Sequence, residues 1–311
     1  MDLSVQLAPK NTRGLILSNP VMTASGTFGY GTEYAHLFDI QKLGAIICKG
    51  TTLLPKEGNK QPRITETASG VINSIGLQNI GVKALIKEKA PVWAAWIIPV
   101  IVNIAGETID DYVQVAKELD GVPGISGIEV NISCPNVQSG GAEFGVNPKT
   151  AAEVTARVKA ATSLPVIMKL TPNTGDVVGV ARAVEEAGAD AISLINTLKA
   201  MAIDINKRKP VLGNITGVLS GPAVKPVALQ MVYQVAKVVK IPIIGLGGIA
   251  TATDALEFIM AGASAVQVGT ANFTDLRAPM LVLEGIAQWT AKEGVNSLKE
   301  IVGAAQVKSG K

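Results

Sequence analysis

Residues that build metal centres and disulfide frameworks are scarce in this 311-residue sequence, which has two cysteines, Cys48 and Cys134, and one histidine, His36. Two isolated cysteines make no disulfide framework and show no metal-ligand spacing, and an ordinary iron–sulfur cluster needs four. A histidine metal site or a Ser-His-Asp triad would have to be built around His36, which lies in an expected surface helix. We therefore expect no metal ion and no cluster in this chain.

Charge and long apolar runs are also scarce. Charged residues make up 17% of the sequence, and 28 basic against 25 acidic side chains give a net charge of +3, too balanced for a nucleic-acid-binding surface. The longest apolar run, residues 90–102, is broken by Pro91 and Pro99, whereas a membrane-spanning helix needs about 20 residues. Residues 1–14 lack the apolar core of a signal peptide. We expect a soluble, cytoplasmic protein that binds neither nucleic acid nor a membrane.

Aromatic residues form only 4% of the sequence, whereas 48% is hydrophobic and 32 residues are glycine, which suits short parallel strands covered by helices. Short apolar runs predict eight strands: residues 20–24, 45–48, 99–102, 128–132, 165–168, 191–195, 241–246 and 265–268. Amphipathic segments predict helices between most of them: residues 108–119, 148–161, 176–187, 225–239 and 253–261. Eight alternating units in this length predict the α/β class and one (β/α)8 TIM-barrel domain over residues 1–311.

Each predicted strand ends in a polar residue or a glycine, and barrel active sites are built from those carboxyl ends. These residues are Ser25, Lys49, Gly50, Asn103, Asn131, Lys169, Asn196, Thr197, Gly247, Gly248, Gly269 and Thr270. The loops after strands seven and eight often bind phosphate, and glycine there lets backbone N–H groups approach an anion. A lysine that ends an apolar strand needs an anion or water. Of Lys49 and Lys169, one is suited to a substrate carboxylate and the other to negative charge on a cofactor.

Residues 127–141 place a thiol beside amide and hydroxyl side chains. Ile128, Val130 and Ile132 alternate with polar residues, which predicts a strand, and Pro135 followed by 139–141 (Ser-Gly-Gly) predicts a loop after it. Cys134 therefore lies just past the carboxyl end of a strand. A random cysteine is usually a small buried apolar residue, but these neighbours favour a catalytic thiol in a ligand-facing pocket.

Two connections are longer than the 12–15 residues above which a loop is usually functional or disordered. The first, residues 50–81, carries Asn73, Ser74, Gly76, Gln78 and Asn79, which predict a substrate lip with amide donors. We expect the second, residues 196–221, to fold over the same barrel mouth.

Together these motifs resemble the dihydroorotate dehydrogenase family, the FMN enzymes of pyrimidine biosynthesis, from residue 19 to about residue 275. The motifs span residues 24–29 (Ala-Ser-Gly-Thr-Phe-Gly), 49–52 (Lys-Gly-Thr-Thr), 73–79 (Asn-Ser-Ile-Gly-Leu-Gln-Asn), 131–136 (Asn-Ile-Ser-Cys-Pro-Asn), 195–197 (Ile-Asn-Thr), 220–222 (Ser-Gly-Pro), 247–249 (Gly-Gly-Ile) and 269–271 (Gly-Thr-Ala). Within that family a cysteine base marks the soluble class. Gly50 and Ser74 depart from the family pattern, since alanine is common at both positions.

The resemblance is strongest to the NAD-linked, two-subunit form (class 1B), on residues 25–31, 139–141 and 196–198. It implies a partner subunit that carries FAD and a [2Fe–2S] cluster, and a homodimer of barrels within a heterotetramer. FMN would be the cofactor of this chain, and NAD+ the final electron acceptor.

The resemblance also assigns roles to single residues. Cys134 would take the proton from C5 of (S)-dihydroorotate while hydride leaves C6 for the flavin. FMN would be held by Ser25, Lys49, Gly50, Asn103, Asn131, Lys169, Ile195, Gly221, Gly247, Gly248, Gly269 and Thr270. Dihydroorotate would be held by Lys49, Asn73, Ser74, Ile75, Gly76, Leu77, Asn131, Asn196 and Thr197.

Three alternatives remain open from the sequence. A dihydropyrimidine dehydrogenase subunit shares the barrel, FMN and the cysteine. A fumarate-linked dihydroorotate dehydrogenase (class 1A) differs in its electron acceptor. A non-catalytic phosphate-binding barrel would need the glycine loops but not Cys134, Lys49 or the amide lip.

Overall fold

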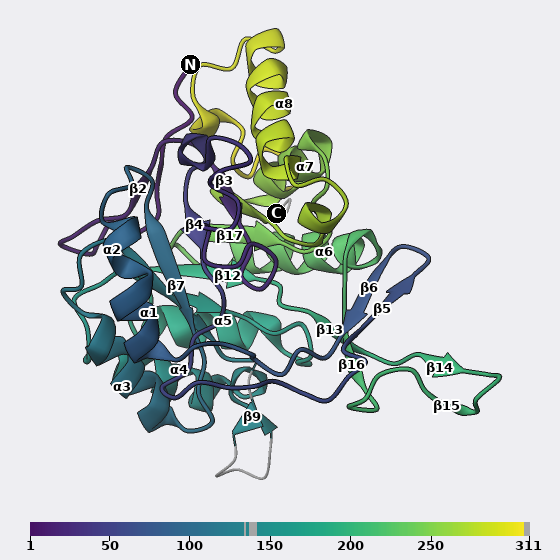
Figure 1. Ribbon diagram of the computed structural model, residues 1–311. Helices are drawn as coiled ribbons and strands as arrows, with labels where there is room; N and C mark the ends of the chain where they lie inside the picture. The colour runs from purple at the N-terminus through teal and green to yellow at the C-terminus, as the bar shows by residue number, and fades with distance from the viewer. Residues whose placement is uncertain (134, 137–141, 308–311) are drawn as a thin grey trace.

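Eight short parallel strands form a closed barrel in the computed structural model, which describes residues 1–133, 135–136 and 142–307 (Figure 1). In the order of the sheet they are β3 (Val21–Thr23), β18 (Ala265–Val268), β17 (Ile243–Leu246), β12 (Ala191–Leu194), β11 (Val166–Lys169), β8 (Gly127–Asn131), β7 (Val100–Ile104) and β4 (Ile46–Ile47). A parallel bridge between Met22 and Ala45 joins β3 to β4 and closes the ring. All eight predicted strands and the predicted barrel are confirmed.

The helices lie outside this ring (Figure 1). They are α1 (Val82–Glu88), α2 (Ala90–Trp93), α3 (Ile109–Leu119), α4 (Pro148–Lys159), α5 (Val177–Glu186), α6 (Lys225–Ala236), α7 (Ala252–Ala261) and α8 (Ala278–Lys292). The five predicted helices are α3 to α7. Thr108 and Thr251 begin α3 and α7 with reciprocal capping boxes, and Gly262 ends α7 with a φ of 122°, a left-handed conformation that favours glycine.

Two predictions about the outer layer were wrong or incomplete. His36 lies exposed in a run of turns and not in a surface helix. Helix α8 was not predicted, because its apolar residues are not confined to one face and Gly285 interrupts the pattern. Gly285 has a packing reason, since a Cβ there would lie 2.4 Å from the Cβ of Ala252 on α7. The two helices therefore approach too closely for a side chain at this position.

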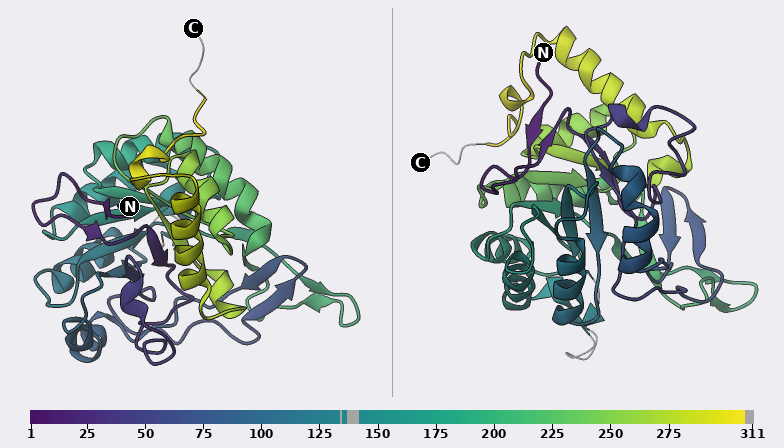
Figure 2. Two further views of the ribbon diagram at one scale, coloured as in Figure 1. Left: turned by 90° about the horizontal axis from the view of Figure 1, so that it is seen from above. Right: turned by 60° about the vertical axis from the view of Figure 1, so that its left-hand side comes forward.

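The two long connections pair with each other in a second, antiparallel sheet. Its order is β13 (Leu198–Ala200), β16 (Gly217–Ser220), β6 (Gly70–Asn73) and β5 (Ile64–Thr67). Beyond it the hairpin of β14 (Ile203–Asp204) and β15 (Lys209–Pro210) extends away from the barrel, as both views in Figure 2 show. Shorter pairs are β1 (Val5–Gln6) with β2 (Ile16–Leu17), and β9 (Pro135–Asn136) with β10 (Ala142–Glu143). The segments read from sequence as loops are thus partly strands.

Replacing Gly285 with alanine should destabilise the protein by about 1–3 kcal/mol, because the new methyl group forces α7 and α8 apart. Gly175→Ala is the matched control, since a Cβ there meets nothing within 4 Å. Urea unfolding followed by circular dichroism measures both. Equal stability of Gly285→Ala and the parent protein would contradict the close approach of the two helices.

Candidate active site at the barrel mouth

Parallel strands bring their carboxyl ends to one end of the barrel, and the predicted residues lie there as the sequence suggests. Ser25 follows β3, Lys49 and Gly50 follow β4, and Asn131 and Lys169 are the last residues of β8 and β11. Residues 195–197, 247–248 and 269–270 follow β12, β17 and β18 in the same way. Asn103 is the exception, because it lies inside β7, beside Glu129 of β8, and so sits deeper than the strand ends.

A polar layer fills the barrel directly beneath these ends, and Glu129 is its centre. The carboxylate is fully buried. Its Oε1 accepts hydrogen bonds from Asn103 Nδ2 at 2.7 Å and Lys169 Nζ at 3.3 Å. Its Oε2 accepts from Ser193 Oγ at 2.9 Å and Gln267 Nε2 at 2.7 Å. A buried charge is tolerated only when it is paired and hydrogen-bonded, and this carboxylate is both.

Lys169 connects that layer to the mouth. Its side chain is 5% exposed, and its ammonium forms an ion pair with Glu129. The same Nζ donates to Ser25 Oγ at 3.2 Å. From the sequence, the partner of this lysine could be water or an anion; in the structure it is a buried carboxylate.

An amide cluster lies at the ends of β8 and β12. Asn196 Nδ2 donates to Asn131 Oδ1 at 3.0 Å and to Ser133 Oγ at 2.9 Å. Thr197 donates its backbone N–H to Asn196 Oδ1 at 2.9 Å, and Tyr112 Oη donates to the carbonyl O of Asn131 at 2.7 Å. These bonds fix the side chains of the cluster relative to one another. It joins three predicted substrate residues in one place.

Lys49 supplies a second positive charge at the mouth. Its backbone N–H donates to the carbonyl O of Gly29 at 2.8 Å, which anchors the strand end. Burial lowers the pKa of the Lys49 ammonium, and the nearby positive charge of Arg63 adds to this while Glu33 opposes it. Among the described residues, no side chain forms an ion pair with Lys49. A half-buried cation without a counter-ion in the described chain is suited to an anionic ligand.

The predicted lip, residues 73–77, begins at the last residue of β6 and turns back toward the barrel. Gly76 and Leu77 have positive φ angles of 75° and 55°, which form this turn. A Cβ added at Gly50 would lie 3.5 Å from Leu77 Cδ2 and 3.1 Å from Asn103 Oδ1. Glycine at position 50 thus relieves a tight contact beneath the lip. The hydroxyl of Ser74 is buried and has no hydrogen-bond partner among the described residues.

The loops after β16, β17 and β18 converge where a phosphate was predicted. A Cβ added at Gly248 would lie 2.9 Å from the carbonyl O of Gly221, and one at Gly221 would lie 3.5 Å from Thr270 Cγ2. Gly247 and Gly248 have φ angles of 119° and 80°, which only glycine adopts readily. Within the described chain, the backbone N–H groups of Gly248 and Thr270 make no hydrogen bond. Free donors on converging loops fit an anion.

Of the two cysteines, the structure describes only Cys48. Cys134 lies outside the described residues, so its catalytic role stays a prediction. Cys48 is fully buried, and burial raises the pKa of its thiol to about 12. Its sulfur hydrogen-bonds to the carbonyl O of Lys49 at 3.5 Å. Cys48 is therefore a packing residue.

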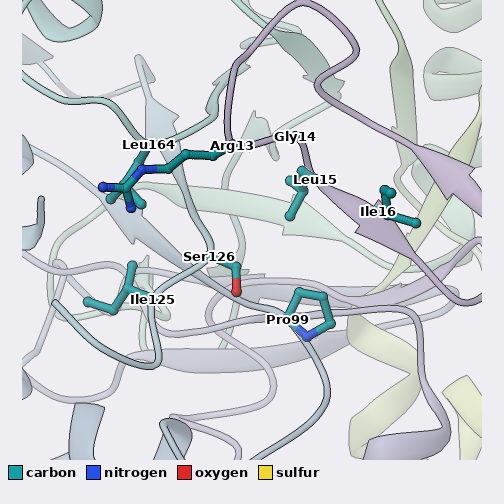
Figure 3. A pocket seen from close by; sticks show the side chains of 8 residues that line it. All are labelled: Arg13, Gly14, Leu15, Ile16, Pro99, Ile125, Ser126 and Leu164. Atoms are coloured by element: carbon teal, nitrogen blue, oxygen red, sulfur yellow. The ribbon is translucent and has the colours of Figure 1, made fainter. Parts of the chain in front are cut away.

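A cavity of about 280 Å³ lies away from this site, near the amino ends of the strands (Figure 3). Its lining includes Pro99, Ser126 and Leu164, which precede β7, β8 and β11, together with Arg13 from the loop between β1 and β2. The barrel mouth, with its converging polar groups, is the better candidate for chemistry.

Glu129, Ser193 and Gln267 were not predicted as site residues. Each is a polar residue inside an otherwise apolar strand, in the runs Gly-Ile-Glu-Val-Asn, Ala-Ile-Ser-Leu and Ala-Val-Gln-Val. That isolated polar position in a buried strand is the signal that sequence reasoning could have used.

Comparisons with known proteins agree with this geometry. Residues 8–289 match the family model described as dihydroorotate dehydrogenase. Three similar proteins are named dihydroorotate dehydrogenase B (NAD(+)), catalytic subunit. The protein of Geotalea daltonii is 56% identical and covers 98% of this chain and 99% of its own length. The protein of Desulforamulus reducens is 58% identical and covers 94% of this chain and 96% of its own length. The protein of Geobacter sulfurreducens is 53% identical and covers 98% of this chain and 99% of its own length.

The raised pKa of Cys48 leads to a prediction about alkylation. At pH 8 an ordinary cysteine, with a pKa near 8.5, is about one quarter thiolate, whereas a pKa of about 12 leaves roughly one part in ten thousand. In the folded protein, iodoacetamide should label Cys48 more than a thousandfold more slowly than in denaturant. Mass spectrometry of the peptide that contains Cys48 measures both rates. Rapid labelling of Cys48 in the folded protein would contradict its burial.

Proposed function

Since the chain belongs to the dihydroorotate dehydrogenase family, we propose that it oxidises (S)-dihydroorotate to orotate in pyrimidine biosynthesis, with FMN as its cofactor. The observation that carries the proposal is the joint presence, at one barrel mouth, of a fixed amide cluster and two lysines. The names of the relatives favour the NAD-linked form over the dihydropyrimidine and fumarate-linked alternatives.

The groups at the mouth fit FMN at both of its ends. The backbone N–H groups of Gly248 and Thr270, which make no hydrogen bond to any described residue, are suited to the phosphate. Lys169, held by Ser25 and Glu129, is suited to the polar edge of the flavin ring. The residues that we propose to hold FMN are Ser25, Lys49, Gly50, Asn103, Asn131, Lys169, Ile195, Gly221, Gly247, Gly248, Gly269 and Thr270. When bound, FMN accepts hydride from the substrate.

The substrate is a six-membered ring with amide N–H and carbonyl groups and one carboxylate. Asn131, Asn196 and Thr197 present donors and acceptors that orient such amides, and their mutual hydrogen bonds limit the reorganisation needed on binding. The Lys49 ammonium, which has no ion-pair partner in the described chain, is suited to neutralise the carboxylate. The lip residues Asn73, Ser74, Ile75, Gly76 and Leu77 would cover the ring and exclude water. In this role the buried hydroxyl of Ser74 gains the partner that it lacks in the described chain.

Cys134 is proposed as the general base that removes the C5 proton. Ser133, the residue before it, accepts a hydrogen bond from Asn196 in the amide cluster, so the described chain reaches the proposed substrate site one residue before Cys134. A thiol with an ordinary pKa near 8.5 is close enough to neutral to act as a base. Protonation of the thiolate and departure of hydride from C6 leave the C5–C6 double bond of orotate.

We propose a partner subunit that carries FAD and a [2Fe–2S] cluster and passes electrons to NAD+. The relatives are named as catalytic subunits of NAD(+) enzymes, which supports a separate partner. The barrels would pair as a homodimer within a heterotetramer. Large exposed apolar side chains on and beside the β14–β15 hairpin, including Ile203, Ile205 and Ile215, support a contact with another chain. No helix in the described part of the chain is long and apolar enough to cross a membrane, and a cytoplasmic location stays a prediction.

Replacing Cys134 with alanine should slow reduction of bound FMN by dihydroorotate by roughly 10²–10⁴-fold, the usual contribution of a positioned base. FMN itself should remain bound, because the proposed cofactor contacts are elsewhere. Stopped-flow absorbance of the flavin measures the rate. Cys48→Ala is the control and should lower stability more than it lowers the rate. Equal rates in the parent protein and Cys134→Ala would show that Cys134 is not the base.

The chain alone should reduce artificial dyes with dihydroorotate but reduce NAD+ poorly, since its two cysteines cannot hold an ordinary cluster. Adding the FAD and iron–sulfur subunit should restore NAD+ reduction. Steady-state assays of the chain with and without that subunit test this. Rapid reduction of NAD+ or of fumarate by the isolated chain would move it to another class of the family.

A further inference from the structure

Glu129 lies on the axis of the barrel. It projects from β8, and one of its partners, Gln267, projects from β18, which is four strands away in the eight-stranded ring. Strands four places apart in a closed ring of eight face each other across the centre. The carboxylate accepts from Asn103 on the neighbouring strand β7 as well. Only a group near the centre can meet partners on both sides.

Lys169 lies on the same axis, one layer closer to the mouth. Its strand position pairs with Asn131, two residues beyond Glu129 on β8, which is about 7 Å along a strand. Its ammonium reaches Ser25, which follows β3, the strand opposite β11 in the ring. The two charges are therefore stacked along the axis, with the negative one below and the positive one at the floor of the mouth.

The hydrogen-bonding capacity of each group is used differently. A carboxylate has about four acceptor sites, and Glu129 meets four donors. An ammonium has three donors, and within the described residues Lys169 uses two of them, on Ser25 and Glu129. The acceptor sites of Glu129 are therefore all used, whereas Lys169 keeps one N–H donor for a ligand.

We propose that Glu129 is a positioning residue that acts on the cofactor through Lys169. It fixes the ammonium on the barrel axis and offsets its charge, and so it sets how strongly Lys169 stabilises the negative charge that a flavin gains on reduction. This inference rests on the proposed function, since it needs FMN at the mouth. It predicts that the charge of Glu129, which is buried beneath the mouth, controls the midpoint potential of the flavin.

The test is the potential of FMN-loaded Glu129→Gln, measured by dye equilibration and flavin absorbance. Without the offsetting charge, Lys169 should stabilise reduced flavin more strongly. We expect at least a tenfold shift of the two-electron equilibrium toward reduced flavin, which corresponds to about 30 mV more positive. An unchanged or more negative potential would overturn the proposal.

A matched control separates this effect from the general loss of a buried ion pair. Asp190 is also a buried carboxylate paired with a lysine, Lys159, at 2.7 Å, but it precedes β12 at the opposite end of the barrel. Asp190→Asn should lower stability and leave the potential unchanged. A shift in Asp190→Asn equal to that in Glu129→Gln would show a nonspecific cause and overturn the proposal.

A double-variant cycle tests whether the effect passes through Lys169. In a Lys169→Met background, Glu129→Gln should shift the potential by less than a third of its shift in the parent protein. If Glu129→Gln does not fold, Ser193→Ala replaces it, because it removes one donor from the carboxylate and keeps the charge. With one donor fewer, the carboxylate charge is less compensated by its other partners and offsets Lys169 more strongly, so the potential should become more negative. No shift in Ser193→Ala would then overturn the proposal.

The same measurements separate this inference from the function on which it rests. A parent chain that binds no FMN, or whose flavin is not bleached by dihydroorotate, contradicts the proposed function. A parent chain that binds and is bleached, together with unchanged potentials in the variants, contradicts only the role of Glu129.

Discussion

The barrel mouth depends on one buried carboxylate. The interior of a (β/α)8 barrel is usually filled by branched aliphatic side chains, but here Glu129 draws donors from β7, β11, β12 and β18 to the centre. Without the carboxylate, each of these donors would be a buried polar group that lacks a hydrogen-bond acceptor, and burying such a group costs free energy. The layer therefore works as a unit, and the position of Lys169 above it follows from the position of the charge beneath.

The remaining groups of the mouth are built on that floor from different parts of the chain. The amide cluster joins the ends of β8 and β12, and the glycine loops after β16, β17 and β18 converge beside it. Two lysines with different environments result. Lys169 is paired and nearly inaccessible, whereas Lys49 is half-buried, without an ion-pair partner in the described chain, and has a lowered pKa. The two lysines are thus suited to different ligands at the same mouth.

Much of this arrangement could be predicted from the sequence, because short apolar strands that end in polar residues form a barrel with a lined mouth. The polar residue at position 129 inside an apolar strand was a usable signal, but its partners could not be assigned, since they lie on strands far apart in the sequence. Strands β5 and β6 were missed for another reason. Strand β5 is mostly exposed and β6 is only partly buried, and the second partner of β6 is β16, which lies far along the sequence. Such a pairing leaves no local pattern.

The antiparallel sheet also bears on synthesis of the protein. Strand β6, which leads into the lip, pairs with β5 on one edge, but its second partner, β16, is absent until translation has passed residue 220. Strand β3 likewise waits for β18, near the end of the barrel sequence, before its second edge is covered. A nascent chain or a truncated product therefore lacks a complete mouth. A ligand that needs groups from all sides of the mouth therefore finds its complete site only after these late strands have paired.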